Sequence, residues 1–125
     1  MKLKLAILLW ATGPDQPHLC ATPFFHAAAA AAMDIEVEIY FTSKSVLLLV
    51  PGVAAKLFAG RDHSHSVYSH MVQAAAEGAK FFACSDAMAA HGVDKTKLIP
   101  EFRGVGGAAA FMARVLDESW STLTY

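Results

Sequence analysis

The chain has 125 residues, a formal net charge of −1 and a charged fraction of only 17%. It contains no block of lysine and arginine, which argues against binding to nucleic acid or to an acidic membrane surface. The hydrophobic fraction of 55% and the mean hydropathy of +0.39 are high for this length. A small monomer cannot bury so much apolar side chain, so we expect a homo-oligomer of a single domain spanning residues 1–125.

The N-terminal segment, MKLKLAILLW, raises the alternative of a signal peptide. No small-residue cleavage site follows it, and Asp15 and His18 come early, so we interpret residues 3–10 as a buried strand. The other long apolar stretch, residues 45–60, is interrupted by a proline, a glycine and a lysine, which argues against a membrane span. We therefore expect a cytoplasmic protein that does not enter a membrane.

The next elements alternate between helix and strand. Residues 20–33, CATPFFHAAAAAAM, are typical of a helix, with Thr22 as the N-cap and Pro23 in the first turn. The segment DIEVEIYFT then alternates apolar and polar side chains, which predicts a strand near an edge of the sheet with one face partly in water. Residues 44–59 are expected to hold two short helical pieces, followed by a polar surface loop at residues 60–66.

The alternation continues in the second half of the chain. Val67, Met71 and Ala75 share one face of a predicted helix that ends at Gly78. A short buried strand, KFFAC, leads into a short helix, SDAMAAHG. A further short strand is expected within residues 98–105.

The C-terminal part predicts an amphipathic helix, AAAFMARVLDE, and a last strand, STLTY. The side chains expected to face inward on this helix are Phe111, Met112, Val115 and Leu116, and those expected outward are Arg114, Asp117 and Glu118. Strands that alternate with helices favour right-handed crossovers. The sequence therefore predicts a three-layer α/β/α fold with a mostly parallel sheet of four or five strands.

Cys84 is the strongest candidate for chemistry. It ends the strand KFFAC and begins the next helix, and sites in open parallel sheets form outside the carboxyl ends of the strands. The helix dipole and partial exposure favour a thiolate there, and Ser85 or Asp86 can cap the helix. Position alone equally allows a small buried cysteine without reactivity.

Three further residues are possible accessories to Cys84. Cys20 opens the first predicted helix, and its thiol could meet Cys84 if the first loop lies beside it. The two cysteines form neither a disulfide framework nor a C-x-x-C motif, so we expect free thiols. His26 and His91 lie near the ends of elements and could pair with a thiolate, although a capping or core role is the simpler interpretation.

Two weaker motifs are interpreted structurally. His63, His65 and His70 form H-x-H-x(4)-H, but only Asp62 is near enough to complete a ligand set, so we expect a solvated loop and no metal. The segment GVGGAA (104–109) satisfies a loose dinucleotide pattern, which we interpret as a tight turn with close helix packing. A nucleotide-binding module and a cysteine hydrolase are the weaker alternatives, and no P-loop or nucleophile-elbow motif supports them.

The order of these features resembles the DsrE/DsrF-like family of sulfur-relay proteins, which includes the TusD-type subunits. The resemblance covers nearly the whole chain and rests on the opening strand, the alanine-rich helix leading into DIEVEIYFT, and the segments FFACSDAMAAHG and RGVGGAAAFMARVL. Its most specific part is the cysteine between an apolar strand and a short helix ending in glycine.

The resemblance implies a three-layer α/β/α fold that assembles as a trimer or hexamer. It also implies that Cys84 carries sulfane sulfur as a persulfide in sulfur relay or sulfur oxidation, and exchanges it with a TusA-like carrier or another persulfide donor or acceptor. Such a sulfurtransferase needs no cofactor. We expect an apolar rim from Phe81, Phe82 and a neighbouring subunit's residues 45–53 to protect the sulfur. The main alternative is a non-catalytic assembly or binding subunit of a sulfur-relay complex.

Overall fold

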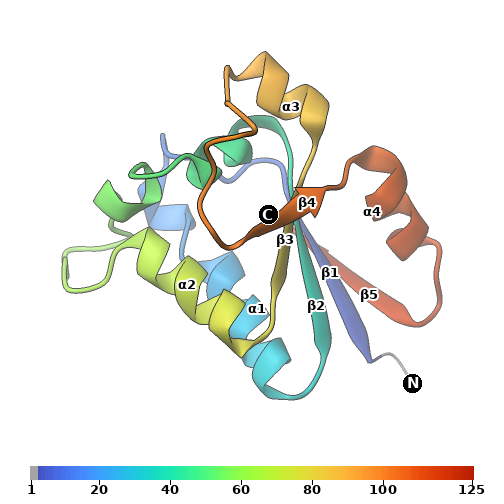
Figure 1. Ribbon diagram of the computed structural model, residues 1–125. Coiled ribbons are helices and arrows are strands. Elements are labelled where there is room, and N and C mark those ends of the chain that lie inside the picture. Colours follow the sequence, from blue (N-terminus) through green and yellow to red (C-terminus); the bar gives the residue numbers. More distant parts are fainter. Residues whose placement is uncertain (1–2) are drawn as a thin grey trace.

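The computed structural model describes residues 3–125 as one five-stranded sheet with helices on both faces (Figure 1). The strands lie in the order β4-β3-β2-β1-β5, and every pairing is parallel. The elements, with η for a 3-10 helix, are β1 (Lys4–Leu9), η1 (Pro17–Leu19), α1 (Thr22–Ala32), β2 (Glu36–Phe41), η2 (Ser43–Leu49), η3 (Ala54–Lys56), α2 (Val67–Glu77), β3 (Lys80–Ala83), α3 (Ser85–Ala90), β4 (Phe102–Val105), α4 (Ala108–Val115) and β5 (Trp120–Thr124). The predicted three-layer α/β/α fold is confirmed, with five strands.

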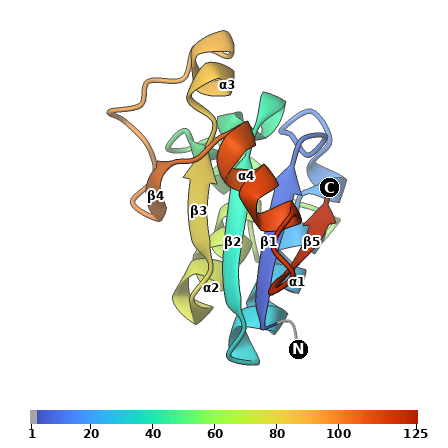
Figure 2. The same ribbon diagram turned by 90° about the vertical axis from the view of Figure 1, so that its right-hand side faces the viewer.

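The helices are divided unequally between the two faces of the sheet. Helices α1 and α2 cover one face, and α4 covers the other (Figure 1). In Figure 2, α4 lies over β2 and β1, and α3 stands beyond the carboxyl end of β3. One short helix therefore covers only part of this face, which leaves the carboxyl edge of the sheet beside α3 and α4 open to form a site.

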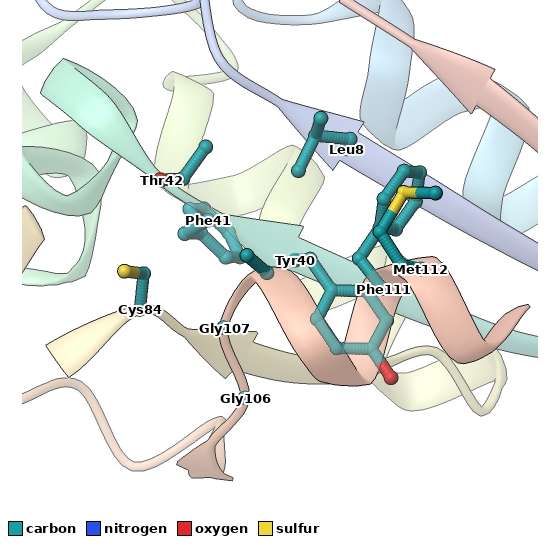
Figure 3. A pocket seen from close by; sticks show the side chains of 10 residues that line it. Leu8, Tyr40, Phe41, Thr42, Cys84, Gly106, Gly107, Phe111 and Met112 are labelled. Carbon is teal, nitrogen blue, oxygen red and sulfur yellow. The ribbon is translucent and has the colours of Figure 1, made fainter. Parts of the chain in front are cut away.

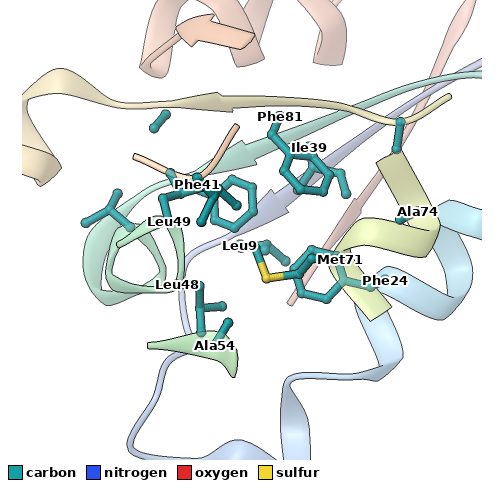
Figure 4. Packing of buried hydrophobic residues seen from close by; sticks show 14 of the residues in the cluster. Leu9, Phe24, Ile39, Phe41, Leu48, Leu49, Ala54, Met71, Ala74 and Phe81 are labelled. Atoms are coloured by element: carbon teal, nitrogen blue, oxygen red, sulfur yellow. The ribbon is translucent and has the colours of Figure 1, made fainter. Parts of the chain in front are cut away.

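The main core lies between the sheet and helices α1 and α2 (Figure 4). The ring of Phe24 on α1 packs on Phe41 of β2 and Phe81 of β3, with ring centroids 6.2 and 6.0 Å apart. Met71 on α2 is fully buried in the same cluster. The buried alanines of α1, Ala27 and Ala31, belong to the same cluster, and their small side chains leave room for α2 to pack closely.

The prediction that residues 34–42 form a strand near an edge is wrong. β2 is the central strand, with β3 on one side and β1 on the other, and its last five residues are all buried. Glu38 is only 5% exposed and Tyr40 only 4%. These polar side chains lie beneath α4 and bond to each other and to Arg114, which is why the strand tolerates them in the centre of the sheet.

Two predicted caps are also wrong. Ala21 is the N-cap of α1, so Thr22 is already the first helical residue and does not cap it with its side chain. Cys84 itself is the N-cap of α3, so neither Ser85 nor Asp86 takes that position. By contrast, α2 ends at Gly78 as predicted, with the backbone there at a φ of 123°.

The orientation of α4 differs from the prediction as well. Phe111 is buried as expected, but Met112, Val115 and Leu116 are 46%, 40% and 78% exposed. Arg114, expected outward, instead points to the sheet and its guanidinium lies 4.2 Å from the ring centre of Trp120. The sheet-facing side of α4 is therefore defined by Phe111 and Arg114.

Residues 60–66 form an exposed segment without regular structure, as expected. The two helical pieces expected in residues 44–59 are the 3-10 helices η2 and η3. Within residues 3–125, no helix is both long enough and apolar enough to cross a membrane.

Candidate functional site

Cys84 lies where β3 passes into α3, as the sequence predicted. Its backbone N–H donates to the carbonyl of Phe41 at 2.9 Å, which extends the pairing of β2 and β3 by one residue. Its carbonyl accepts from Met88 at 3.1 Å within α3. The residue is thus held firmly by its backbone while its side chain is partly exposed.

The start of a second helix also faces the thiol. Gly107 is the N-cap of α4, and a Cβ at that position would lie 3.8 Å from the Sγ of Cys84. The N–H groups in the first turn of a helix have no partner within it, and they carry positive partial charge. Cys84 therefore stands at the N-terminal ends of α3 and α4.

A pocket of about 290 Å³ opens beside the thiol (Figure 3). Cys84 lies at one end of it, and Phe111 and Met112 lie at the other. The residues that line the pocket are Leu8, Tyr40, Phe41, Thr42, Cys84, Gly106, Gly107, Ala108, Phe111 and Met112. They come from the carboxyl ends of β1, β2 and β3 and from the start of α4, which is where ligands bind in open parallel sheets.

The lining of this pocket is apolar. Among its ten lining residues none carries a charge, and only Tyr40, Thr42 and Cys84 have polar side-chain atoms. The Tyr40 hydroxyl turns away and donates to the Oε1 of Glu38 at 2.7 Å, so its ring faces the pocket. Burial, together with this bond to Glu38, raises the pKa of Tyr40 to about 12. The tyrosine is therefore neutral under ordinary conditions and acts as an apolar wall.

The wall is supported by a polar network beneath α4. Arg114 donates from Nε to the Oε1 of Glu38 at 2.9 Å and from Nη2 to its Oε2 at 3.2 Å. Trp120 covers the other side of the guanidinium. Tyr40 and Arg114 both donate to Glu38, so the network connects α4 to β2, the strand that carries the Tyr40 wall of the pocket.

Among the glycines of GVGG, Gly106 is the one in close packing. A Cβ on Gly106 would come within 3.0 Å of Tyr40 Cε1 and 3.1 Å of Phe82 Cβ. The backbone can therefore cross the Tyr40 and Phe82 rings only without a side chain at this position. The sequence predicted a tight turn with close helix packing in this segment, but Gly104 lies on β4 and the close contacts of Gly106 are with side chains of the sheet.

The structure does not bring the three possible accessories to this pocket. Cys20 is fully buried, and its thiol donates to the carbonyl of Gly13 at 3.2 Å. Burial raises the pKa of this thiol. His26 is exposed on α1 and bonds to the hydroxyl of Tyr125, and His91 is the exposed C-cap of α3. None of the three is among the residues that line the pocket.

Three further histidines, His63, His65 and His70, lie on α2 and in the segment before it. His63 stacks on Phe58, and His65 and His70 lie 6.2 Å apart between ring centres. Burial and the neighbouring His65 lower the pKa of His70. Among residues 3–125, no group of three or more His, Cys, Asp and Glu side chains is arranged to hold a metal ion.

The sequence interpretation missed most of the pocket. Phe81 was expected at its rim but is buried in the core on the other face, and Phe82 stacks on Tyr40 outside the lining. Thr42 and Leu8 were not singled out, although each lies at the carboxyl end of its strand, and that position was the signal that could have found them. Within this chain, the lining comes from β1, β2, the end of β3 and the start of α4.

Comparisons with known proteins bear on this site. The model of the DsrE/DsrF-like family matches residues 4–125. The chain belongs to the DsrE/DsrF-like family. Proteins of this family generally act in sulfur relay, within sulfur-relay complexes.

Solved structures support the fold of this family. The YchN protein from E. coli is 13% identical, with a TM-score of 0.75 and complete coverage of both chains. MTH1491 from Methanobacterium thermoautotrophicum, a protein of unknown function, is 17% identical with a TM-score of 0.66, over 99% of this chain and 100% of that one. A comparison with curated protein sequences finds no match.

Proposed function

We propose that the chain is a sulfurtransferase or sulfur carrier that holds sulfane sulfur as a persulfide on Cys84. The observation that carries this proposal is the position of the Cys84 thiol, which is partly exposed, borders an apolar pocket and faces the starts of two helices. Membership of a family that generally acts in sulfur relay supports it. The remaining thiol, Cys20, is buried, and burial raises its pKa, which makes it a poor alternative.

The proposed transfer needs only thiol chemistry. The Cys84 thiolate attacks the outer sulfur of a donor persulfide, a new S–S bond forms, and the donor leaves as a thiolate. In the second step an acceptor thiolate attacks the outer sulfur of the Cys84 persulfide, and Cys84 leaves as a thiolate. Each step breaks one S–S bond and makes one. The helix starts at Cys84 favour the anionic sulfur before and after each transfer.

Sulfur loading tests the proposal directly. The protein is incubated with a persulfide or polysulfide donor, and intact mass is measured for the wild type, Cys84→Ser and Cys20→Ser. We expect sulfur adducts on the wild type and on Cys20→Ser and none on Cys84→Ser. Adducts that dithiothreitol removes would identify sulfane sulfur. A wild type that gains no sulfur would contradict the carrier function.

The alternative is a non-catalytic assembly or binding subunit of a sulfur-relay complex. The exposed apolar side chains on α4, Met112, Val115 and Leu116, are the observation that favours an assembly role. A protein that takes no sulfur but still binds a TusA-like carrier protein in a pull-down would support this alternative.

The partners and setting are part of the same proposal. We propose a homo-oligomer, a trimer or hexamer, in which part of the exposed apolar surface is covered, and a TusA-like carrier or another persulfide protein as donor or acceptor. The proposed location is the cytoplasm, where free thiols stay reduced. Residues 1–125 are proposed to form a single domain. Sedimentation of the wild type and of Leu116→Glu tests the oligomer, which the charged variant should weaken.

A further inference from the structure

The pocket beside Cys84 is much larger than a persulfide requires. Its volume is about 290 Å³, whereas a water molecule has a share of about 30 Å³ in the liquid. One sulfane sulfur atom is of that order of size. A single sulfur on Cys84 would therefore leave most of the pocket unfilled.

The walls of the pocket suit sulfur atoms better than they suit oxygen atoms. Sulfur is soft and polarizable and makes favourable contacts with aromatic rings, and the rings of Tyr40 and Phe111 and the thioether of Met112 line the pocket. A sulfonate group carries charged oxygens that each need hydrogen-bond partners when they leave water. Among the side chains of the lining, only the Thr42 hydroxyl is offered to such oxygens, because the Tyr40 hydroxyl is engaged with Glu38.

The start of α4 lies at the Cys84 end of the pocket. The first backbone hydrogen bond of α4 runs from Phe111 to Gly107 at 3.1 Å, so the N–H groups of residues 108–110 precede it. Gly107 and Ala108 line the pocket. The positive end of α4 therefore lies beside the sulfur atoms nearest Cys84, and a negative terminal sulfur would lie near it only in a chain that turns back towards Gly107.

We propose that this pocket holds a chain of several sulfane sulfur atoms on Cys84, and that its preferred donor is inorganic polysulfide and not an oxyanion such as thiosulfate. The inference rests on the proposed function of Cys84. The thiolate attacks an inner sulfur of the polysulfide dianion and forms one S–S bond. The S–S bond beyond that sulfur breaks, the shortened polysulfide leaves as a dianion, and the protein keeps a chain with one negative charge. The numbers of atoms and electrons balance without an oxidant.

Two matched variants on α4 test where the chain lies. Ala108 and Ala109 are both exposed alanines in the first turn, but only Ala108 lines the pocket. With excess polysulfide, we expect intact mass to show adducts of more than one sulfur atom on the wild type and on Ala109→Trp. Ala108→Trp should fill part of the pocket and keep mainly the single-sulfur adduct. Leu8→Phe narrows the pocket from β1 and should shift the distribution in the same direction.

Donor choice gives an independent measurement. Loading rates with polysulfide and with thiosulfate are measured for the wild type and divided by the rates of the same donors with free cysteine. We expect the normalised rate to favour polysulfide by about tenfold or more, the equivalent of one poorly compensated polar group. A wild type that carries only a single sulfur, or an Ala108→Trp adduct pattern equal to that of Ala109→Trp, would overturn this inference and leave the persulfide function intact. A wild type that takes up no sulfur would overturn both.

Discussion

Arg114 on α4 and Glu38 on β2 are 76 positions apart in the sequence, yet they form a two-point ion pair beneath α4, with N–O distances of 2.9 and 3.2 Å. The Glu38 side chain is 6% exposed and that of Arg114 is 33% exposed. Because the Tyr40 hydroxyl also donates to Glu38, this pair connects the position of α4 to the wall of the Cys84 pocket. Four predictions follow from these contacts and from those around Cys84.

Removal of the arginine should destabilise the fold. Arg114→Ala leaves the Glu38 carboxylate buried with only the Tyr40 hydroxyl, and we expect a loss of about 2 kcal/mol in the free energy of unfolding, less than for a fully buried pair because Arg114 is partly in water. The double variant Glu38→Met with Arg114→Met should regain most of this loss, since it leaves no unpaired charge. Urea unfolding of the three proteins measures both effects, and a double variant no more stable than Arg114→Ala would contradict this account.

The stability of the wild type relative to Tyr40→Phe should depend on alkaline pH. The pKa of Tyr40 is raised from 10.0 to about 12 by burial and by the Glu38 carboxylate. Below pH 10 the tyrosine is protonated in both states, and its hydrogen bond makes the wild type more stable by about 1 kcal/mol. Between pH 10 and 12 the unfolded chain loses this proton while the folded chain keeps it, so the wild type loses stability relative to the variant.

The size of that loss is on the order of 2 kcal/mol, enough to remove or reverse the initial difference. Unfolding curves of both proteins at a series of pH values up to 12 give the measurement. Other groups titrate equally in the two proteins, so they cancel in the comparison. A stability difference that stays constant through this range would show that Tyr40 keeps its ordinary pKa.

Gly106 should tolerate no side chain, whereas Gly104 should. In Gly106→Ala the new methyl group would meet Tyr40 at 3.0 Å and the Cβ of Phe82 at 3.1 Å. The Tyr40 ring cannot move away freely because its hydroxyl is hydrogen-bonded, and the Cβ of Phe82 is attached directly to the backbone. We expect a loss of about 1–3 kcal/mol. Gly104→Ala on β4 meets nothing within 4 Å and should change stability by less than about 0.5 kcal/mol. Thermal unfolding of the pair tests the difference, and equal losses would refute it.

The two thiols should react with iodoacetamide at very different rates. Cys84 is partly exposed, whereas Cys20 is fully buried, donates to Gly13 and has a pKa raised by burial. Under native conditions we expect alkylation of Cys84 alone, with Cys20 at least about a thousandfold slower because its reaction waits for unfolding. Peptide mass mapping gives the sites, and Cys84→Ser in denaturant provides the control in which only Cys20 is labelled. Early labelling of Cys20 would show that its segment opens locally.

The placement of Cys84 could be predicted because it depends on local pattern alone. An apolar run followed by a short helical segment defines the end of a parallel strand, and Cys84 is indeed the N-cap between β3 and α3. The pocket could not be predicted in this way. Its walls join Leu8, Thr42 and Ala108, which only the strand order β4-β3-β2-β1-β5 brings together.

The wrong predictions for the polar face of β2 and for the direction of Arg114 have the same physical cause. Alternation in DIEVEIYFT predicted a wet face, and the charge of Arg114 predicted an outward position. Glu38 is buried and Arg114 is half-buried because the two side chains pair with each other. The sequence pattern of one segment cannot show that a charged residue has a partner in a distant segment. With Arg114 turned to the sheet, Met112 and Leu116 are left exposed on the far side of α4.

The position of β1 between β2 and β5 has a consequence for how the protein is made. Strand β1 can pair with β2 once residues 36–41 have been synthesised, but its other edge has no partner until residues 120–124 follow. During synthesis on the ribosome, the backbone of β1 therefore presents an unpaired edge while most of the chain is translated. Such an edge is a template for wrong pairing with other chains. The nascent chain is most exposed to aggregation in this interval, and a chaperone would act on β1 before β5 arrives.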